Sequence, residues 1–241
     1  MATLEEVGPP GHPLAELQTR EFRLRRRTIL VALFTLLFPP LIVWTFVNLW
    51  RLGNLQRDLR IVQAGVTGEL STRAVFLNLD DRYTVLPDLT IEVEGRRSQI
   101  DHIVVGPTGV FVVETKNLNG YIEGAAEDRE IVQHKIGRRG GRYSKRLYNP
   151  VHQVRTHVHR VSRLLKSHGL QSWVNAAVYF ANPDAVVDLD GGSVRVFSAR
   201  DDGARRLLAF VETPYEYISP AAQAAIVDLI KTAAVRGETI A

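Results

Sequence analysis

Two carboxylates and a lysine stand close together in a stretch that is otherwise apolar. Residues 99–117 contain two β-branched runs on either side of a glycine-flanked turn at 106–109, a pattern typical of a strand, a tight turn and a second strand. If the two glycines of the turn pair, Asp101 lies opposite Glu114, and Lys116 shares their face. We therefore expect two acids and an ammonium group side by side on one face of a hairpin.

Such a grouping needs a counter-charge. Opposed carboxylates repel, and burying either one without a partner costs several kcal/mol. A divalent cation would remove this cost, because Mg²⁺ is typically held by one or two carboxylates, with waters and substrate phosphates completing its shell. The alternative is a structural salt bridge from Lys116 to one of the acids at the sheet edge. The spacing alone leaves both interpretations open.

These residues also carry a resemblance to a known family. Asp101, followed by Glu114-Thr115-Lys116, resembles the Asp…Glu-x-Lys core of the PD-(D/E)xK nuclease superfamily, and the surrounding stretch resembles the nuclease-related domain, NERD. Gly68-Glu69 and the Asn149-Pro150…Gln153 segment resemble two further motifs of that family, so the resemblance covers roughly residues 65–180. Ile100 replaces the proline of the family pattern, but the acid that follows it is present.

The resemblance implies a restriction-endonuclease-like fold and a nuclease that uses Mg²⁺ or Mn²⁺. The backbone carbonyl of Thr115 would join Asp101 and Glu114 as metal ligands. Lys116 would position or activate the attacking water and stabilise charge on the phosphate. Glu69 would reach the metal site, or else cap a helix dipole; Gln153 would orient substrate or water, or else be a surface glutamine. The candidate catalytic residues are Asp101, Glu114, Lys116, Glu69 and Gln153.

A second candidate site lies in residues 125–148, where basic residues alternate with glycines and two tyrosines. We interpret this stretch as a flexible loop that contacts the phosphates of nucleic acid, most simply DNA, because such contacts are electrostatic and independent of base sequence. The alternative is an exposed loop without a partner. The candidate nucleic-acid-binding residues are Lys135, Arg138, Arg139, Arg142, Lys145 and Arg146.

Composition limits the remaining possibilities. The chain has 241 residues and a net charge of +4, which is compatible with a nucleic-acid or anionic membrane partner. It contains no cysteine, so disulfides and thiolate metal sites are excluded.

The N-terminal region predicts a membrane segment. Residues 1–27 read as a disordered tail that becomes arginine-rich, and residues 28–50 contain no charged side chain. As one helix this run would be about 35 Å long, against a hydrocarbon core of about 30 Å. Because Pro39-Pro40 lies at its centre, the run is either one kinked spanning helix or a hairpin of helices at 28–38 and 41–50.

The two forms place the rest of the chain on different sides of the membrane. The arginines before the segment weakly favour a cytoplasmic N-terminus. A single span would then carry the nuclease-like part outside, whereas a hairpin would keep it in the cytoplasm. We expect the cytoplasm, because nucleic acid is there.

The elements that must position the site follow the segment. Residues 51–64 read as a linker helix that is interrupted near Gly65, and residues 65–241 as the nuclease-like domain. Short apolar runs at 83–86 and 89–93 lead into the central hairpin. Asn149-Pro150 begins a helix that ends near His168, and two more helices follow two further strands. This order predicts an α/β fold with a mixed sheet flanked by helices.

Overall fold

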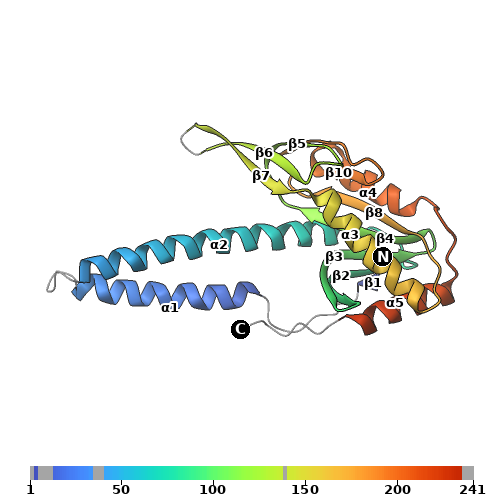
Figure 1. Ribbon diagram of the computed structural model, residues 1–241, viewed down its shortest axis with the longest axis horizontal. Coiled ribbons are helices and arrows are strands. Elements are labelled where there is room, and N and C mark those ends of the chain that lie inside the picture. Colours follow the sequence, from blue (N-terminus) through green and yellow to red (C-terminus); the bar gives the residue numbers. More distant parts are fainter. Residues whose placement is uncertain (1–2, 5–12, 35–40, 138–139, 235–241) are drawn as a thin grey trace. The chain divides into compact units, whose positions relative to one another are not determined.

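The protein is described from a computed structural model, which describes residues 3–4, 13–34, 41–137 and 140–234 (Figure 1). The chain divides into two compact units, one formed by residues 9–67 and 239–241, and the other by residues 1–8 and 68–238. The candidate site residues all belong to the second unit.

The first unit contains α1 (Pro13–Phe34) and most of α2 (Leu41–Phe76). The uncharged run 28–50 is shared between these helices, and residues 35–40, with the two prolines, lie outside the described residues. Among the helices of the described part, none has the length and apolar character needed to cross a membrane.

Two expectations for this region were wrong. Residues 13–27 lie in α1 and are not a disordered tail; good helix formers and an ion pair from Glu21 to Arg25, 2.5 Å long, support the helix there. The interruption expected near Gly65 is not seen either, because α2 continues through it, at the modest cost of about 1 kcal/mol for a helical glycine.

The second unit is built on two mixed sheets, where the sequence predicted one. In the larger sheet, β2, β3 and β4 are antiparallel neighbours, and β8 runs parallel to both β4 and β10. The two apolar runs around Pro87 form the single strand β2. The strand order is β1 (Thr3–Leu4), β2 (Thr84–Val93), β3 (Arg96–Gly106), β4 (Gly109–Lys116), β8 (Val174–Phe180) and β10 (Arg195–Ser198).

The smaller sheet occupies the region interpreted from sequence as a flexible basic loop. Its order is β7 (Arg142–Tyr148), β6 (Glu130–Ile136), β5 (Gly120–Gly124) and β9 (Ala185–Leu189). β6 and β7 form an antiparallel hairpin, so the prediction of a loop was wrong for these residues. The alternation that would have revealed the strands is weak, because nearly every side chain of β7 is exposed.

Helices cover both faces of the larger sheet, which confirms the mixed α/β class (Figure 1). Buried side chains of α3 (Pro150–Ser167) and α5 (Pro220–Ala233) join one core with alternate residues of β3 and β4. Phe76 at the end of α2 and the apolar residues of α4 (Gly203–Glu212) form the second core on the opposite face. A short 3₁₀ turn at Ala199–Asp201 precedes α4.

The helix α3 begins as the sequence predicted. The side chain of Asn149 accepts a hydrogen bond from the N–H of Val151 at 3.0 Å, and Pro150 occupies the first turn. The two amide hydrogens of Asn149 are also used, by the carbonyls of Ala125 and Asp128. This cap therefore ties the start of α3 to the segment between β5 and β6.

Candidate active site

The β3–β4 hairpin places the two acids as expected. Its register pairs Gly106 with Gly109 and continues to His102 and Val113; one further step puts Asp101 opposite Glu114. The main-chain pairing of β3 with β4 ends at His102 and Val113. Beyond it, Asp101 Oδ2 accepts a hydrogen bond from the N–H of Thr115 at 2.7 Å. A carboxylate therefore occupies the end of the ladder, on the face that α3 covers.

Lys116 joins the Glu114-Thr115-Lys116 motif of β4 to the Asn149-Pro150…Gln153 motif of α3. Its Nζ donates to Glu114 Oε1 at 2.6 Å and to Gln153 Oε1 at 2.9 Å. Glu114 is 1% exposed, while the lysine side chain is 26% exposed, so the pair points from the core toward solvent. Gln153 lies in the first turn of α3, and the Asn149 cap fixes where that turn meets β4. The ammonium group is thus held from two elements.

A buried histidine completes the surroundings of Glu114. His157 Nε2 lies 3.4 Å from Glu114 Oε2, close enough for an ion pair with a protonated ring but without the alignment of a hydrogen bond. Its Nδ1 lies 3.2 Å from Ser98 Oγ, and Arg160 donates to the same hydroxyl and to the carbonyl of Arg97. Sequence reasoning gave His157 no part in the site.

The Gly68-Glu69 motif has a packing reason. A Cβ at Gly68 would lie 2.7 Å from Asn117 Cβ, so only glycine lets this turn of α2 approach the end of β4 so closely. One turn later, the hydroxyls of Thr72 and Thr115 are 3.0 Å apart. This contact brings Glu69 into the electrostatic field of Glu114 and Lys116.

Two carboxyls of the site, those of Asp101 and Glu69, have raised pKa values. Burial, and then the charge of Glu114, raise the pKa of Asp101 from 3.8 to about 8. Burial, followed by the charges of Asp88 and Glu114, raises the pKa of Glu69 from 4.5 to about 7. Asp88 faces Asp101 across β2 and β3 and has a positive φ of 46°, where the ladder skips it. More negative charge gathers here than one lysine neutralises.

The donor set suits a hard divalent cation that keeps several waters. Within the described residues, no hydrogen bond reaches the buried Glu114 Oε2, whose neighbour is His157 Nε2 at 3.4 Å. The described residues contain no cluster of three or more histidine, cysteine or acidic side chains that could hold a metal by themselves. Carboxylates in small number, completed by water and phosphate, are what Mg²⁺ uses. Thr115 contacts Asp101 through its N–H, and the predicted role of its carbonyl stays a prediction.

The predicted nucleic-acid-binding residues lie on the β6–β7 hairpin. Lys135 is on β6, and Arg142, Lys145 and Arg146 are on β7, whereas Arg138 and Arg139 lie outside the described residues. A short connection leads from β4 to β5, and Gln133 Nε2 on β6 donates to the carbonyl of Asn119 in that connection at 2.7 Å. The site and the hairpin are therefore linked by the first residues after Lys116.

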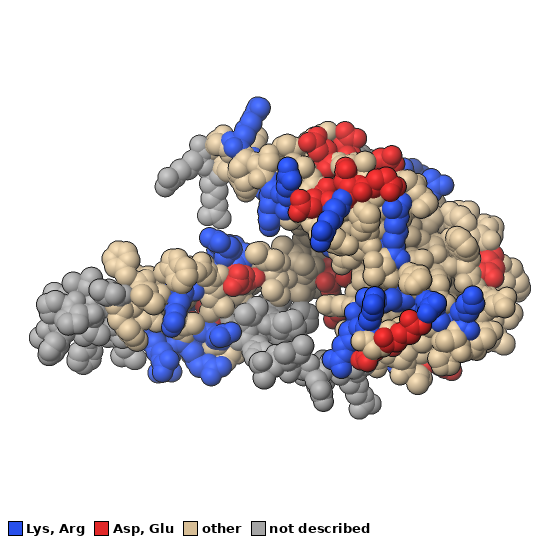
Figure 2. Space-filling view, in the orientation of Figure 1, with Lys and Arg blue, Asp and Glu red and all other residues tan. Residues whose placement is uncertain are grey.

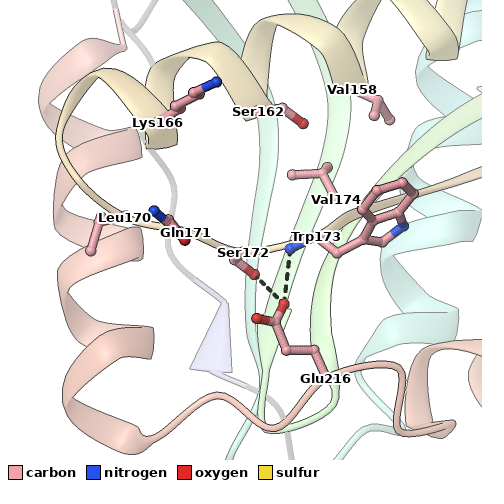
Figure 3. A pocket seen from close by; sticks show the side chains of 9 residues that line it. All are labelled: Val158, Ser162, Lys166, Leu170, Gln171, Ser172, Trp173, Val174 and Glu216. Atoms are coloured by element: carbon pink, nitrogen blue, oxygen red, sulfur yellow. Dashed lines mark hydrogen bonds between the residues drawn. The ribbon is translucent and has the colours of Figure 1, made fainter.

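A hollow elsewhere on the domain contains none of the predicted site residues. A cleft of about 570 Å³ lies between the second half of α3 and the start of β8, bordered by the exposed ring of Trp173 (Figure 3). Glu216 accepts hydrogen bonds there from Ser172 Oγ and the N–H of Trp173. Val174 pairs with Val110 at the start of β4, so this cleft is about 20 Å from Lys116 at its end.

Two members of the cluster were missed because their signals are spatial. His157 follows Gln153 by one helical turn, so the two share a face, but nothing in the sequence near α3 shows that this face meets Glu114. Asp88 stands in an apolar run beside a proline, where it reads as a turn residue.

Comparison with known proteins agrees with this geometry. The family described as the nuclease-related domain matches residues 64–181, which include every acid and basic residue of the two candidate sites. An uncharacterized protein of Bacillus anthracis is 36% identical over 104 residues, which are 42% of this chain and 47% of the relative. The chain thus spans about half the length of this curated relative. No solved structure matches the chain.

Proposed function

Since residues 64–181 form a nuclease-related domain, we propose that this chain is a metal-dependent nuclease that hydrolyses phosphodiester bonds of DNA. The observation that carries the proposal is the placement of Lys116 Nζ between Glu114 and Gln153, where its charge also acts on the carboxyl of Asp101. An ammonium group next to a partly buried acidic pair is suited to hold a phosphate at a metal-binding edge.

Lys116 acts on the substrate in this proposal. An ammonium group has three N–H donors, and Glu114 and Gln153 take two of them. The third is available to a non-bridging phosphate oxygen or to the attacking water. Because both acceptors come from well-packed elements, the donor is oriented before substrate arrives, which lowers the cost of stabilising the charge that develops on the phosphoryl oxygens.

Asp101 and Glu114 would hold Mg²⁺ or Mn²⁺, with Glu69 and the carbonyl of Thr115 as further ligands. The support is that Glu114 Oε2 accepts no hydrogen bond from the described residues, and that the pKa values of Asp101 and Glu69 are raised by burial and neighbouring acids, which a cation would reverse. When bound, such an ion supplies Lewis-acid polarisation of a phosphoryl oxygen and a water of lowered pKa.

The same proposal includes a membrane anchor. The uncharged run 28–50 behind a cluster of arginines supports attachment to a membrane through α1 and the start of α2, with the nuclease-related domain in the cytoplasm. A helical hairpin that enters and leaves the same side needs no helix of spanning length.

One observation favours a second function. The 2.6 Å contact between Lys116 and Glu114 is already a complete ion pair, as a structural salt bridge would be. The chain would then be a non-catalytic nucleic-acid-binding or scaffold module that retains the fold.

A cleavage assay separates the two functions. The full-length chain, purified in detergent, is incubated with plasmid and linear DNA, with Mg²⁺, Mn²⁺ or a chelator. We expect metal-dependent cleavage that is lost in Asp101→Asn, Glu114→Gln and Lys116→Met. His159→Gln, at an exposed position of α3, is the matched control. Cleavage that persists equally in the three site variants would reject the proposed site.

A further inference from the structure

The two faces of the β6–β7 hairpin differ in charge. Residues directly opposite in an antiparallel pair share a face, and the register pairs Ile131 with Leu147 and Lys135 with Tyr143. We call the face that continues from Ile131 the inner face; it comprises Ile131, Gln133, Lys135, Tyr143, Lys145 and Leu147. The remaining residues of the two strands form the outer face.

The inner face lies on the same side of its sheet as α3. Ile131 is buried in one core with Val151 and Val154, which belong to the helix that carries Gln153. Gln133 is buried and donates to Asn119, three residues beyond Lys116. Where this core ends, the inner face continues outward with the two lysines and the tyrosine.

The inner-face lysines lack an acidic counterpart. No acidic side chain of the described residues is within ion-pair distance of Lys135 or Lys145, which are diagonal neighbours across the strands. Partial burial, and then the charge of Lys145, lower the pKa of Lys135. Two cations that repel each other on one face favour an anionic ligand, because the ligand relieves the repulsion.

The outer face balances its charges internally. Arg146 lies 3.7 Å from Glu130, and His134 contacts Glu123 at 2.8 Å. On the same surface, Tyr121 donates to Asp188. Figure 2 shows acidic and basic side chains intermingled over this sheet. This face therefore offers an anion little net attraction. A hollow of about 610 Å³ at the hairpin is lined by residues of both faces, including Lys135 and Tyr143 of the inner face.

Tyr143 adds an aromatic surface between the two lysines. It lies directly opposite Lys135 and two residues from Lys145 on the same strand face, and it is 52% exposed. Cations that track a backbone, interleaved with an exposed aromatic ring on which a base can stack, are the features of proteins that bind single strands. A closed duplex would use the lysines but leave the ring without a partner.

We propose that the inner face of the β6–β7 hairpin binds a single strand of nucleic acid, with phosphates on Lys135 and Lys145 and a base stacked on Tyr143. This inference rests on the proposed function and names its substrate class: an unpaired strand that runs from the hairpin toward Lys116. The outer-face arginines, Arg142 and Arg146, take no part in it.

Fluorescence anisotropy with the full-length chain tests the assignment. The probes are a labelled oligothymidylate of about 15 nucleotides, within the range of known single-strand sites, and a duplex of equal length. A chelator prevents cleavage. We expect Lys135→Gln with Lys145→Gln to weaken binding and to reduce the slope of log K against log salt by about 1.4, since each lost phosphate contact removes about 0.7. Arg142→Gln with Arg146→Gln removes the same charge from the outer face, and should change the affinity and the salt slope clearly less than the inner-face pair does.

The aromatic contact has its own matched pair. Tyr143→Leu should lower the affinity for oligothymidylate at least about fivefold, and Tyr143→Phe should retain it, because stacking needs the ring and not the hydroxyl. Tyr148→Leu, at an exposed tyrosine of the outer face, is the control. Thermal melting of each variant checks that the fold is kept.

Several results would overturn the assignment. A larger effect of the outer-face pair, wild-type affinity in Tyr143→Leu, or duplex bound as tightly as the single strand would each reject it. Loss of binding to phosphatidylserine vesicles in the inner-face pair, with binding to DNA unchanged, would instead make this face a membrane contact. The proposed catalysis can fail independently. If the chain binds single strands through the inner face but does not cleave them, the proposed nuclease activity is rejected and the binding site is retained.

Discussion

Asp101 Oδ2 accepts a hydrogen bond from the N–H of Thr115, 2.7 Å away, at the point where the β3–β4 ladder ends. One carboxyl therefore serves as a strand cap and stands next to a second acid, Glu114. The cap stabilises the anionic form of Asp101, whereas burial and the charge of Glu114 oppose it and prevail, which raises its pKa to about 8. The stability of the folded chain should therefore depend on pH through Asp101.

The first prediction concerns pH. Because the pKa of Asp101 is raised by burial from 3.8 to about 8, the folded state binds this proton more tightly than the unfolded state. Its contribution to stability is complete below about pH 4 and is lost as the pH rises to about 8. In a chelator, the free energy of unfolding should fall over this range, and Asp101→Asn should flatten the fall. Urea melts at several pH values measure the free energy of unfolding. If it falls with pH as steeply in Asp101→Asn as in the wild type, the prediction is contradicted.

The second prediction concerns metal. Mg²⁺ or Mn²⁺ should raise the melting temperature of the full-length chain, because a ligand at 100 times its Kd stabilises the folded state by about 2.7 kcal/mol. Glu114→Gln keeps the shape of the side chain but removes a ligand charge, so the shift should shrink. Glu127→Gln removes an exposed acid outside the site and is the control. An equal shift in both variants would place the metal elsewhere.

The third prediction separates catalysis from structure at Lys116. With a catalytic role, Lys116→Met should abolish cleavage while largely retaining the metal-induced shift. A structural salt bridge predicts another outcome: no metal response, and a loss of about 3–5 kcal/mol because a buried acid is left unpaired. Because Glu114 is almost fully buried, loss of its partner would lower the melting temperature measurably if the ion pair is structural. Thermal melts with and without metal, together with cleavage rates, distinguish the two outcomes.

The hairpin at the centre of the site was predictable because its signals are local. The glycines of the turn and the alternating apolar residues specify the register, and with it the approach of Asp101 to Glu114. The start of α3 was predictable for the same reason, since Asn149 and Pro150 satisfy the helix end within one turn. Each of these features is decided by neighbours in the chain.

The features that were missed depend on residues far apart in the sequence. The strand β7 reads as loop because its side chains face water on both sides, and only pairing with β6 makes it a strand. His157 and Glu114 are 3.4 Å apart because α3 packs on β4, which no local pattern records. The placement of Gln153 on Lys116 follows from the same packing.

The fourth prediction concerns the membrane. The full-length chain should stay with membranes after alkaline extraction, because the run 28–50 has no charge. Phe34→Arg with Phe46→Arg should release it, since two arginines in an apolar segment cost about 2.5–3.5 kcal/mol each. Ile61→Arg, at an exposed position outside the run, should not. Full recovery of the wild-type chain in the soluble fraction would reject the anchor.

The fifth prediction concerns Gln153 as a positioning residue. Its Oε1 accepts a hydrogen bond from Lys116 Nζ at 2.9 Å, and Glu114 is the other acceptor of that ammonium group. Gln153→Met removes the acceptor and keeps the length, so Lys116 would be held by Glu114 alone. We expect the cleavage rate to fall by about one to two orders of magnitude, as for other misplaced catalytic groups.

Stability and metal response should not follow that loss, because Gln153 is only partly buried and contacts the site through its amide oxygen. Thr156→Val, on an exposed position of the same helix, is the control for changes in α3 itself. Gln153→Glu restores an acceptor for Lys116 and should recover part of the rate. If Gln153→Met cleaves at the wild-type rate, the contact with Lys116 serves only the packing of α3 on β4.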